Sequence, residues 1–128
     1  MILPGNHEKT LPIIIYEEMK GTICIRGRSI STEVEEYFAD FLPYLQDNLT
    51  KNPMNMSVNV DLEYFNTRTA RLLMSFFYII KQYVYDKGYN ADITWIIEEG
   101  DDDIQSAAED YSIISKMEFK YVYKPEED

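Results

Sequence analysis

The sequence predicts an α/β fold in which helices pack on a mixed β-sheet. Segments with strand character alternate with segments of helical periodicity, in the order β-β-α-β-α-β-α-β. Strands that alternate with helices imply a mostly parallel sheet with right-handed crossovers, and a leading hairpin makes that sheet mixed. The chain of 128 residues has the length of one domain, so residues 1–128 are expected to form a single domain.

The first two strands are expected over Ile13–Glu18 and Thr22–Arg28, both of which are rich in β-branched residues. Gly21 lies between them and can adopt the positive φ that a tight turn requires, so the pair is predicted to be a hairpin. Residues 1–10 include the polar stretch Asn6-His7-Glu8-Lys9. Such a terminal stretch is expected to be flexible.

A helix is expected after the hairpin. Ser31 or Thr32 followed by Glu35 forms a capping box, which is typical of a helix start. Apolar residues then recur at helical spacing as far as Leu49. Pro43 lies inside this pattern and predicts a kink, because proline cannot donate the backbone hydrogen bond of a helix interior.

A strand of alternating pattern and a long apolar helix form the middle of the chain. The strand is expected from about Met54 to Phe65, with every second residue apolar: Met56, Val58, Val60, Leu62 and Tyr64. The helix begins near Asn66 or Thr67 and ends at Lys87-Gly88. Its segment 72–80 is apolar over most of its circumference, which predicts a helix covered on more than one side.

The last third of the chain predicts a strand, a helix and a strand. Asp92–Glu98 is expected to be a buried strand, and Asp101-Asp102-Asp103 suits a helix N-terminus, where negative charge is favoured. Phe119–Tyr123 is the last strand, and residues 124–128 are expected to be flexible. The inner face of the helix is predicted to carry Ile104, Ala107, Ala108, Tyr111 and Ile114.

The composition excludes several classes of function. The chain has 23 acidic and 12 basic side chains, a formal net charge of -11, which disfavours nucleic acids and anionic membranes. It contains a single cysteine, Cys24, and a single histidine, His7, so we expect no disulfide, no Cys- or His-based metal site and no cofactor. No signal segment or membrane span is evident, which predicts a cytoplasmic protein.

The junction between the third strand and the central helix stands out. Asn66 is a good helix cap, and Thr67 and Thr69 place two hydroxyls in the first turn. In α/β sheets, ligands and partners bind where strand ends lead into helix N-termini. Arg68 and Arg71 also lie there, although cations oppose the helix dipole at this end. The alternative is an ordinary cap with Arg–Glu pairs on the surface.

The sequence resembles the SiaC family of regulatory phosphoproteins from bacterial biofilm-control pathways. The resemblance runs from about Thr10 to Tyr123. It depends on Gly27-Arg28-Ser29 before the first helix, on Leu62-Glu63-Tyr64-Phe65-Asn66-Thr67 at the central junction, and on Thr94-Trp95 with Glu98-Glu99. It implies a fold similar to the STAS domains of anti-sigma-factor antagonists, in agreement with the order of elements.

The resemblance also implies a switch in a protein that is not itself an enzyme. A family threonine, which matches Thr67, is phosphorylated by a Ser/Thr kinase and restored by a metal-dependent phosphatase, and the unphosphorylated form binds and activates a diguanylate cyclase. This chain has Arg68-Thr69-Ala70-Arg71 where serines and a lysine are more usual, which leaves Thr69 as a second candidate. The residues expected to flank the partner surface are Tyr64, Phe65, Asn66, Arg68 and Arg71.

Two other functions remain open at this level. The first is an anti-sigma-factor antagonist that binds an anti-sigma kinase in a partner-switching pathway. The second is an enzyme that uses acidic residues around Glu63 and Glu98, with a divalent metal. The second function lacks a nucleophile–base pair in the sequence. Neither requires a nucleic acid or a membrane.

Overall fold

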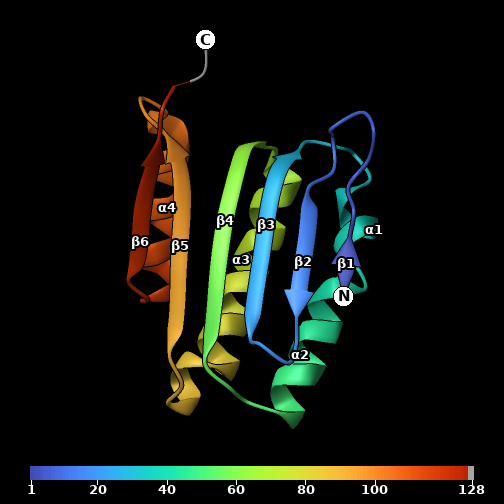
Figure 1. Ribbon diagram of the computed structural model, residues 1–128, viewed down its shortest axis with the longest axis vertical. Coiled ribbons are helices and arrows are strands. Elements are labelled where there is room, and N and C mark those ends of the chain that lie inside the picture. The colour runs from blue at the N-terminus through green and yellow to red at the C-terminus, as the bar shows by residue number, and fades with distance from the viewer. Residues whose placement is uncertain (127–128) are drawn as a thin grey trace.

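The strands form one sheet in chain order, β1-β2-β3-β4-β5-β6 (Figure 1). The structure, a computed structural model, describes residues 1–126. Pairing is antiparallel from β1 to β3 and parallel from β3 to β6, so the predicted mixed α/β fold is confirmed. The elements are β1 (Ile2–Leu3), β2 (Ile13–Glu17), β3 (Thr22–Ser29), α1 (Val34–Phe38), α2 (Phe41–Lys51), β4 (Met56–Phe65), α3 (Thr67–Tyr83), the short 3-10 helix η1 (Tyr85–Lys87), β5 (Ala91–Glu98), α4 (Asp102–Ser115) and β6 (Phe119–Lys124).

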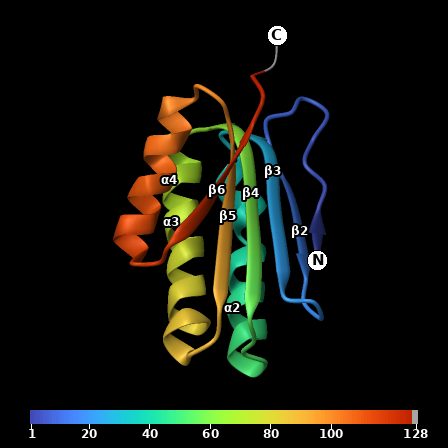
Figure 2. The ribbon, with the colours of Figure 1, turned by 60° about the vertical axis from the view of Figure 1, so that its left-hand side comes forward.

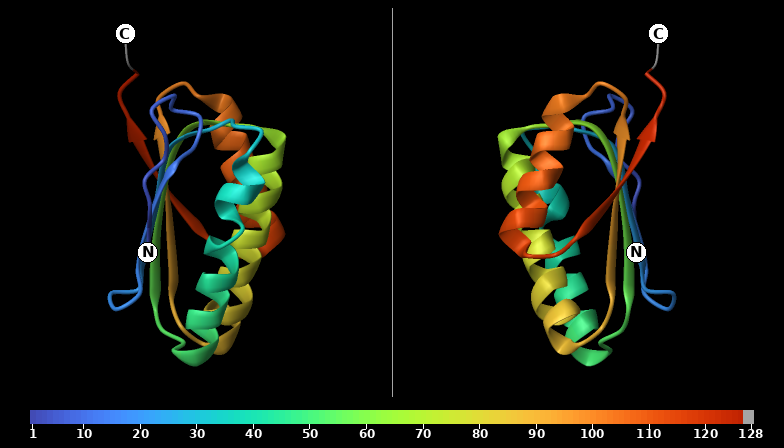
Figure 3. Two further views of the ribbon diagram at one scale, coloured as in Figure 1. Left: turned by 90° about the vertical axis from the view of Figure 1, so that its right-hand side faces the viewer. Right: turned by 90° about the vertical axis from the view of Figure 1, so that its left-hand side faces the viewer.

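Helices α1 to α4 cover one face of the sheet and leave the other face open (Figure 3). Helix α3 lies between α2 and α4 in this layer (Figure 2), so the predicted burial of its apolar segment on more than one side is confirmed. The core lies between the layers, where alternate strand residues such as Ile25, Val60 and Trp95 are fully buried. Across residues 1–126, none of the helices combines the length and hydrophobicity that a membrane crossing requires.

The predicted first helix is split into α1 and α2. The break falls at Ala39 and Asp40, and Pro43 lies in the first turn of α2. Backbone N–H groups in the first turn of a helix have no intrahelical acceptor, so a proline there removes no hydrogen bond. The predicted kink at Pro43 is therefore wrong, because a new helix begins just before the proline.

The amino terminus is attached to the sheet by a strand that was not among the predicted elements. Ile2 and Leu3 pair with β2, and the Met1 ammonium group donates to the Tyr16 carbonyl at 2.8 Å and to the Glu18 carboxylate at 3.2 Å. A strand of two residues is too short to show a period in the sequence. At the other end, residues 127–128 of the predicted tail lie outside the described residues.

An irregularity near the end of β4 reverses the direction of its last side chains. Gly27 pairs with Leu62 but Arg28 pairs with Tyr64, so Glu63 is an extra residue in β4. A β-bulge of this kind inverts the alternation that follows it. Tyr64 is consequently 61% exposed, whereas Phe65 packs inward, with its ring centroid 6.4 Å from that of Trp95. Tyr64 therefore does not share the buried side of β4 with Met56, Val58, Val60 and Leu62, although the sequence places all five in one alternating pattern.

Strands β4 and β5 separate toward their carboxyl ends. Their pairing runs from Met56 opposite Ala91 to Val60 opposite Trp95 and stops there, and the gap between them widens in Figure 1. Strand β5 continues to pair with β6 as far as Glu98. Phe65 and the start of α3 therefore lie at the edge of a fork in the sheet.

Candidate functional site: the β4–α3 junction

Asn66 connects β4 to α3 and fixes the first turn of the helix. Its side-chain oxygen accepts a hydrogen bond from the backbone N–H of Thr69 at 2.9 Å, as an N-cap residue does. Its side-chain nitrogen donates to the Ser31 carbonyl at 3.2 Å, and its backbone N–H donates to the Ser29 carbonyl at 3.0 Å. The capping role that the sequence predicts for Asn66 is therefore confirmed. In addition, Asn66 attaches the helix to the end of β3, which the sequence does not predict.

Thr69 is completely buried beneath this cap. Its hydroxyl oxygen lies 2.7 Å from the Ser29 hydroxyl, 2.9 Å from the Ser29 carbonyl and 2.8 Å from the Asn66 side-chain oxygen. Ser29 is also fully buried, so each of the two hydroxyls finds its hydrogen-bond partner inside the protein instead of in water. This polar cluster attaches the start of α3 to β3, and it leaves no open path to the Thr69 hydroxyl.

Thr67 has the opposite environment, although it lies only two residues away. It is the first residue of α3, its side chain is exposed, and its hydroxyl makes no hydrogen bond with any residue between 1 and 126. The hydroxyl also stands beside the unpaired backbone N–H groups of the first helical turn, where a negative group is favoured. An enzyme could therefore reach Thr67 without any local unfolding.

The two arginines after Thr67 point to different neighbours. The Arg68 guanidinium donates to the Thr32 carbonyl at 3.3 Å and lies 3.8 Å from the Glu35 carboxylate, so it interacts with the region of α1. This is one Arg–Glu pair of the kind expected if the junction were an ordinary helix cap with Arg–Glu pairs on the surface. Arg71 is exposed and forms no ion pair in the described part of the chain. It lies one helical turn after Thr67, on the same face of α3.

Thr67 and Arg71 border a groove between α3 and α4, which we call the α3–α4 groove. Its volume is about 430 Å³ and its lining is mainly apolar: Phe65, Thr67, Ala70, Arg71, Met74, Ala107, Asp110, Tyr111 and Ile114. The Tyr111 hydroxyl donates to the Ala70 carbonyl at 2.8 Å and so joins the two helices. Burial raises the pKa of Tyr111 from its ordinary value of 10.0 to about 12, so this donor keeps its proton at a pH at which an exposed tyrosine ionises.

A family profile described as "SiaC family regulatory phosphoprotein" matches residues 6–124. The chain belongs to the SiaC family. Among curated protein sequences no match to the chain was found. The match covers the junction, the α3–α4 groove and all strands except β1.

Solved structures of the SiaC family share the fold. The chain is similar to SiaC of Pseudomonas aeruginosa, with a TM-score of 0.80 and 16% identity over 98% of each chain. It is also similar to a chain in the crystal structure of the diguanylate cyclase SiaD in complex with its activator SiaC from the same organism, with a TM-score of 0.83 and 16% identity over 98% and 99% of the two chains.

The structure brings together some of the residues that the sequence grouped at this SiaC-family junction. Phe65, Thr67 and Arg71 all line the α3–α4 groove. Asn66 is partly buried as the cap, and Arg68 interacts with the region of α1. Tyr64 faces the uncovered side of the sheet because of the bulge in β4.

Sequence reasoning missed the wall of the groove that α4 supplies. Ala107, Asp110 and Ile114 line it, although Ile114 was assigned to the inner face of its helix. Ile114 is 59% exposed, and its neighbour Ile113 is 73% exposed, so the assignment of Ile114 was wrong. Neighbouring helical residues can both be buried, as Phe76 and Phe77 of α3 are, so the adjacent isoleucines alone do not reveal that Ile114 is exposed.

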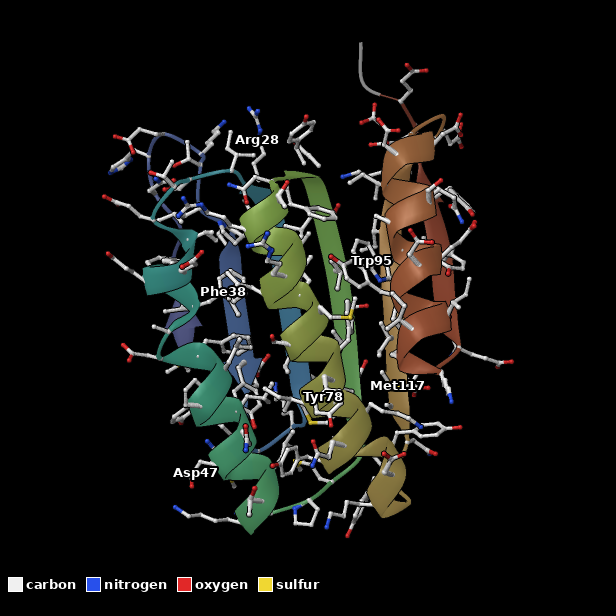
Figure 4. All side chains as sticks on the ribbon, turned by 180° about the vertical axis from the view of Figure 1, so that it is seen from behind. Arg28, Phe38, Asp47, Tyr78, Trp95 and Met117 are labelled. Carbon is white, nitrogen blue, oxygen red and sulfur yellow. The ribbon has the colours of Figure 1, made fainter. Side chains whose placement is uncertain are left out.

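Trp95 lies beneath the groove, between α3 and α4 in Figure 4. Its ring is stacked on that of Tyr111, with centroids 6.1 Å apart and an interplanar angle of 12°. The indole N–H is buried and has no hydrogen-bond partner among the described residues. The single tryptophan of the chain therefore lies next to the groove that Thr67 borders.

The acidic side chains of the described residues are not clustered in the way that a metal centre requires. Within residues 1–126, no group of three or more His, Cys, Asp or Glu side chains is arranged to hold a metal ion. Glu63 and Glu98 lie on β4 and β5 beyond Val60 and Trp95, where the pairing of these strands has stopped. Asp101 caps α4 by accepting a hydrogen bond from the Ile104 N–H at 3.1 Å, as expected for the acidic run.

Proposed function

We propose that this SiaC-family protein is a non-enzymatic phospho-switch of the bacterial cytoplasm. In the unphosphorylated form it binds and activates a diguanylate cyclase. A Ser/Thr kinase modifies Thr67 and releases the cyclase, and a metal-dependent phosphatase restores the binding form. The observation that carries the proposal is the contrast between the exposed, unbonded Thr67 hydroxyl at the rim of the α3–α4 groove and the buried Thr69 hydroxyl.

A phosphate on Thr67 is compatible with the fold. It adds a charge of about -1.5 to -2 and three acceptor oxygens. These oxygens meet the free N–H groups at the start of α3, and Arg71 is available one turn later for a charge-assisted hydrogen bond. The modification therefore changes the surface of the groove and leaves the core intact.

The same phosphate weakens the binding of a partner that covers the groove. A partner fitted to a neutral hydroxyl and an apolar wall would have to desolvate a dianion, and an uncompensated buried charge costs several kcal/mol. Each 1.4 kcal/mol corresponds to about a tenfold change in affinity. The complex of SiaD with its activator SiaC, whose fold this chain shares, supports a cyclase as the partner.

The site of modification is tested by mass spectrometry after incubation of the purified protein with ATP and the Ser/Thr kinase encoded beside its gene. We expect phosphate on Thr67. Thr67→Val should abolish the modification, whereas Thr50→Val, at an exposed threonine of α2, should not change it. Modification of Thr69 with Thr67 left free would contradict the proposal.

The partner is tested by capture from a lysate of the source bacterium, followed by identification of the bound protein. A diguanylate cyclase captured by the unmodified protein, and at least tenfold weaker capture by Thr67→Glu, is expected. Thr50→Glu is the control, because it adds the same charge at an exposed threonine on α2. Capture of an ATPase-fold kinase without a cyclase would instead indicate an antagonist of an anti-sigma factor.

A further inference from the structure

A second hollow lies on the open face of the sheet, at the carboxyl end of β3. The loop between β1 and β2 forms one wall, and β3, β4 and β6 form the floor. Its volume is about 470 Å³, within the range of small-molecule sites. Figure 1 shows the loop beside the upper end of β3, and Figure 4 shows Arg28 at this end of the molecule.

Charged side chains of both signs line the hollow, with an excess of cations. Lys9, Arg26, Arg28 and Lys124 are basic, and Asp61 and Glu63 are acidic. Four of the 12 basic residues thus converge on one hollow, in a chain whose net charge is -11. Clustered cations repel one another and raise the local concentration of anions. The local charge of the hollow is therefore opposite in sign to the net charge of the molecule.

Most of this positive charge is not neutralised by the protein. The Lys124 ammonium group lies 2.8 Å from the Asp61 carboxylate, so these two charges compensate. Lys9, Arg26 and Arg28 form no ion pair and no side-chain hydrogen bond with residues 1–126. Glu63 is the other acid of the lining and is exposed. The hollow therefore offers three cationic groups with unused donors.

The loop wall is held in place by its own hydrogen bonds. The Asn6 side-chain oxygen accepts from the backbone N–H groups of Thr10 at 2.9 Å and Leu11 at 3.0 Å. The Gly5 N–H donates to the Tyr37 hydroxyl at 2.7 Å, which fixes the loop to α1. Lys9 adopts a left-handed conformation with φ 57°, which is uncommon for a residue with a side chain. The wall is thus ordered before any ligand arrives.

We propose that this hollow binds a small phosphate-bearing ligand of nucleotide size. The Arg26 and Arg28 guanidinium groups suit a phosphate, because their planar donors match its oxygens. Leu11 and Ile13 provide an apolar surface beside them for a ring. The hollow also lies at the carboxyl ends of the parallel strands β3 and β4, the end of an α/β sheet at which ligands bind. The site is separate from the α3–α4 groove and does not depend on modification of Thr67.

The ligand class is tested by calorimetry and thermal unfolding with AMP, inorganic phosphate and adenosine at constant ionic strength. AMP is expected to bind with a Kd of about 1 mM or tighter and to raise the Tm, and adenosine is not. Stronger binding of AMP than of inorganic phosphate indicates a nucleotide, whereas equal binding indicates that the phosphate group alone is recognised. Both results support the site, and binding of neither anion overturns it.

The location is tested with the double variant Arg26→Gln/Arg28→Gln. Both side chains are exposed, so the variant should fold, which circular dichroism verifies. We expect at least a tenfold loss of AMP affinity. The double variant Lys20→Gln/Lys51→Gln removes the same charge at exposed positions outside the hollow and should bind as the unchanged protein does. Equal losses in both variants would overturn the assignment, because they would indicate binding through net charge alone.

Discussion

At the scale of single residues, the main result is the difference between Thr67 and Thr69. The sequence indicates that both lie in the first turn of a helix capped by Asn66, and the structure confirms this. The sequence does not reveal that Thr67 is exposed and Thr69 buried, because the burial of Thr69 depends on Ser29, which is 40 residues away. Local capping rules predict the turn, but the end of a distant strand decides which hydroxyl faces water.

This difference predicts unequal effects on stability. Thr69→Val keeps the shape of the side chain but removes the hydroxyl that bonds to Ser29, so a buried polar group loses its partner. We expect a loss of about 1–3 kcal/mol in the free energy of unfolding. Thr67→Val, at an exposed and unbonded position, should change it by less than about 0.5 kcal/mol.

Urea denaturation followed by circular dichroism measures both variants under one set of conditions. Equal unfolding midpoints for Thr69→Val and Thr67→Val would contradict the buried cluster. The same measurement decides whether a Thr67 variant is suitable for binding experiments. If its stability is unchanged, a change in its binding is caused by the altered surface and not by unfolding.

At the scale of elements, type and order were predictable and local irregularities were not. Alternation and helical spacing give the strands and helices in their correct order, because these periods follow from which side chains face the core. The bulge at Glu63 interrupts the strand period by a single residue, whereas the helix breaks at Ala39 and Asp40 without any interruption of the apolar spacing. Such irregularities depend on pairing with β3 and on packing between helices, which a local pattern does not contain.

The bulge matters for the candidate site. It turns Phe65 toward Trp95 and the α3–α4 groove, and it turns Tyr64 toward the open face. Gly27, opposite the bulge, has φ 108°, a conformation that side chains rarely adopt. The Gly27-Arg28-Ser29 segment is the end of β3, and its glycine permits the change of register.

Helix α3 carries a net positive charge in an acidic protein, and this predicts a role for its charge. Its sequence contains Arg68, Arg71 and Lys81 and no acidic residue. Arg68 interacts with Glu35 and Lys81 with Asp86, which leaves Arg71 for a partner. Arg71→Glu should weaken binding of the unphosphorylated protein to the proposed cyclase partner at least tenfold, because an anion would replace the cation available to that partner at the rim of the groove.

A binding titration by surface plasmon resonance at two salt concentrations measures this effect. Lys20→Glu makes the same change of charge in the β2–β3 turn, where Lys20 pairs with Glu17, and is expected to bind normally. If Lys20→Glu weakened binding as much as Arg71→Glu, net charge rather than the groove would be responsible.

At the scale of the whole molecule, the sheet has two faces with different chemistry. The covered face holds the core, and the α3–α4 groove lies in the helix layer that covers it. The open face carries the cationic hollow beside the loop between β1 and β2. This hollow could not be predicted from the sequence, because its residues come from four separate segments that only the topology of the sheet brings together.

Two buried tyrosines predict a loss of stability of the whole fold at high pH. Burial raises the pKa of Tyr16 and of Tyr111 to about 12, from an ordinary value of 10.0. Between these values the unfolded chain has released the phenol protons while the folded chain retains them. The unfolded state then binds fewer protons, so its relative stability rises with pH. The free energy of unfolding should therefore be constant below pH 10 with respect to these groups, and should fall above it by about 1.4 kcal/mol per pH unit for each tyrosine.

Tyr111→Phe isolates one of the two contributions. At pH 8 the variant should be less stable by about 0.5–1.5 kcal/mol, because it loses the hydrogen bond to the Ala70 carbonyl. Between pH 10 and pH 11, however, its stability should fall less steeply than that of the unchanged protein, because one shifted group has been removed. Tyr78→Phe, at a side chain that is 64% exposed, serves as the control. Urea midpoints at pH 8, 10 and 11 give both slopes, and identical slopes for Tyr111→Phe and the unchanged protein would mean that Tyr111 does not keep its proton in the folded state.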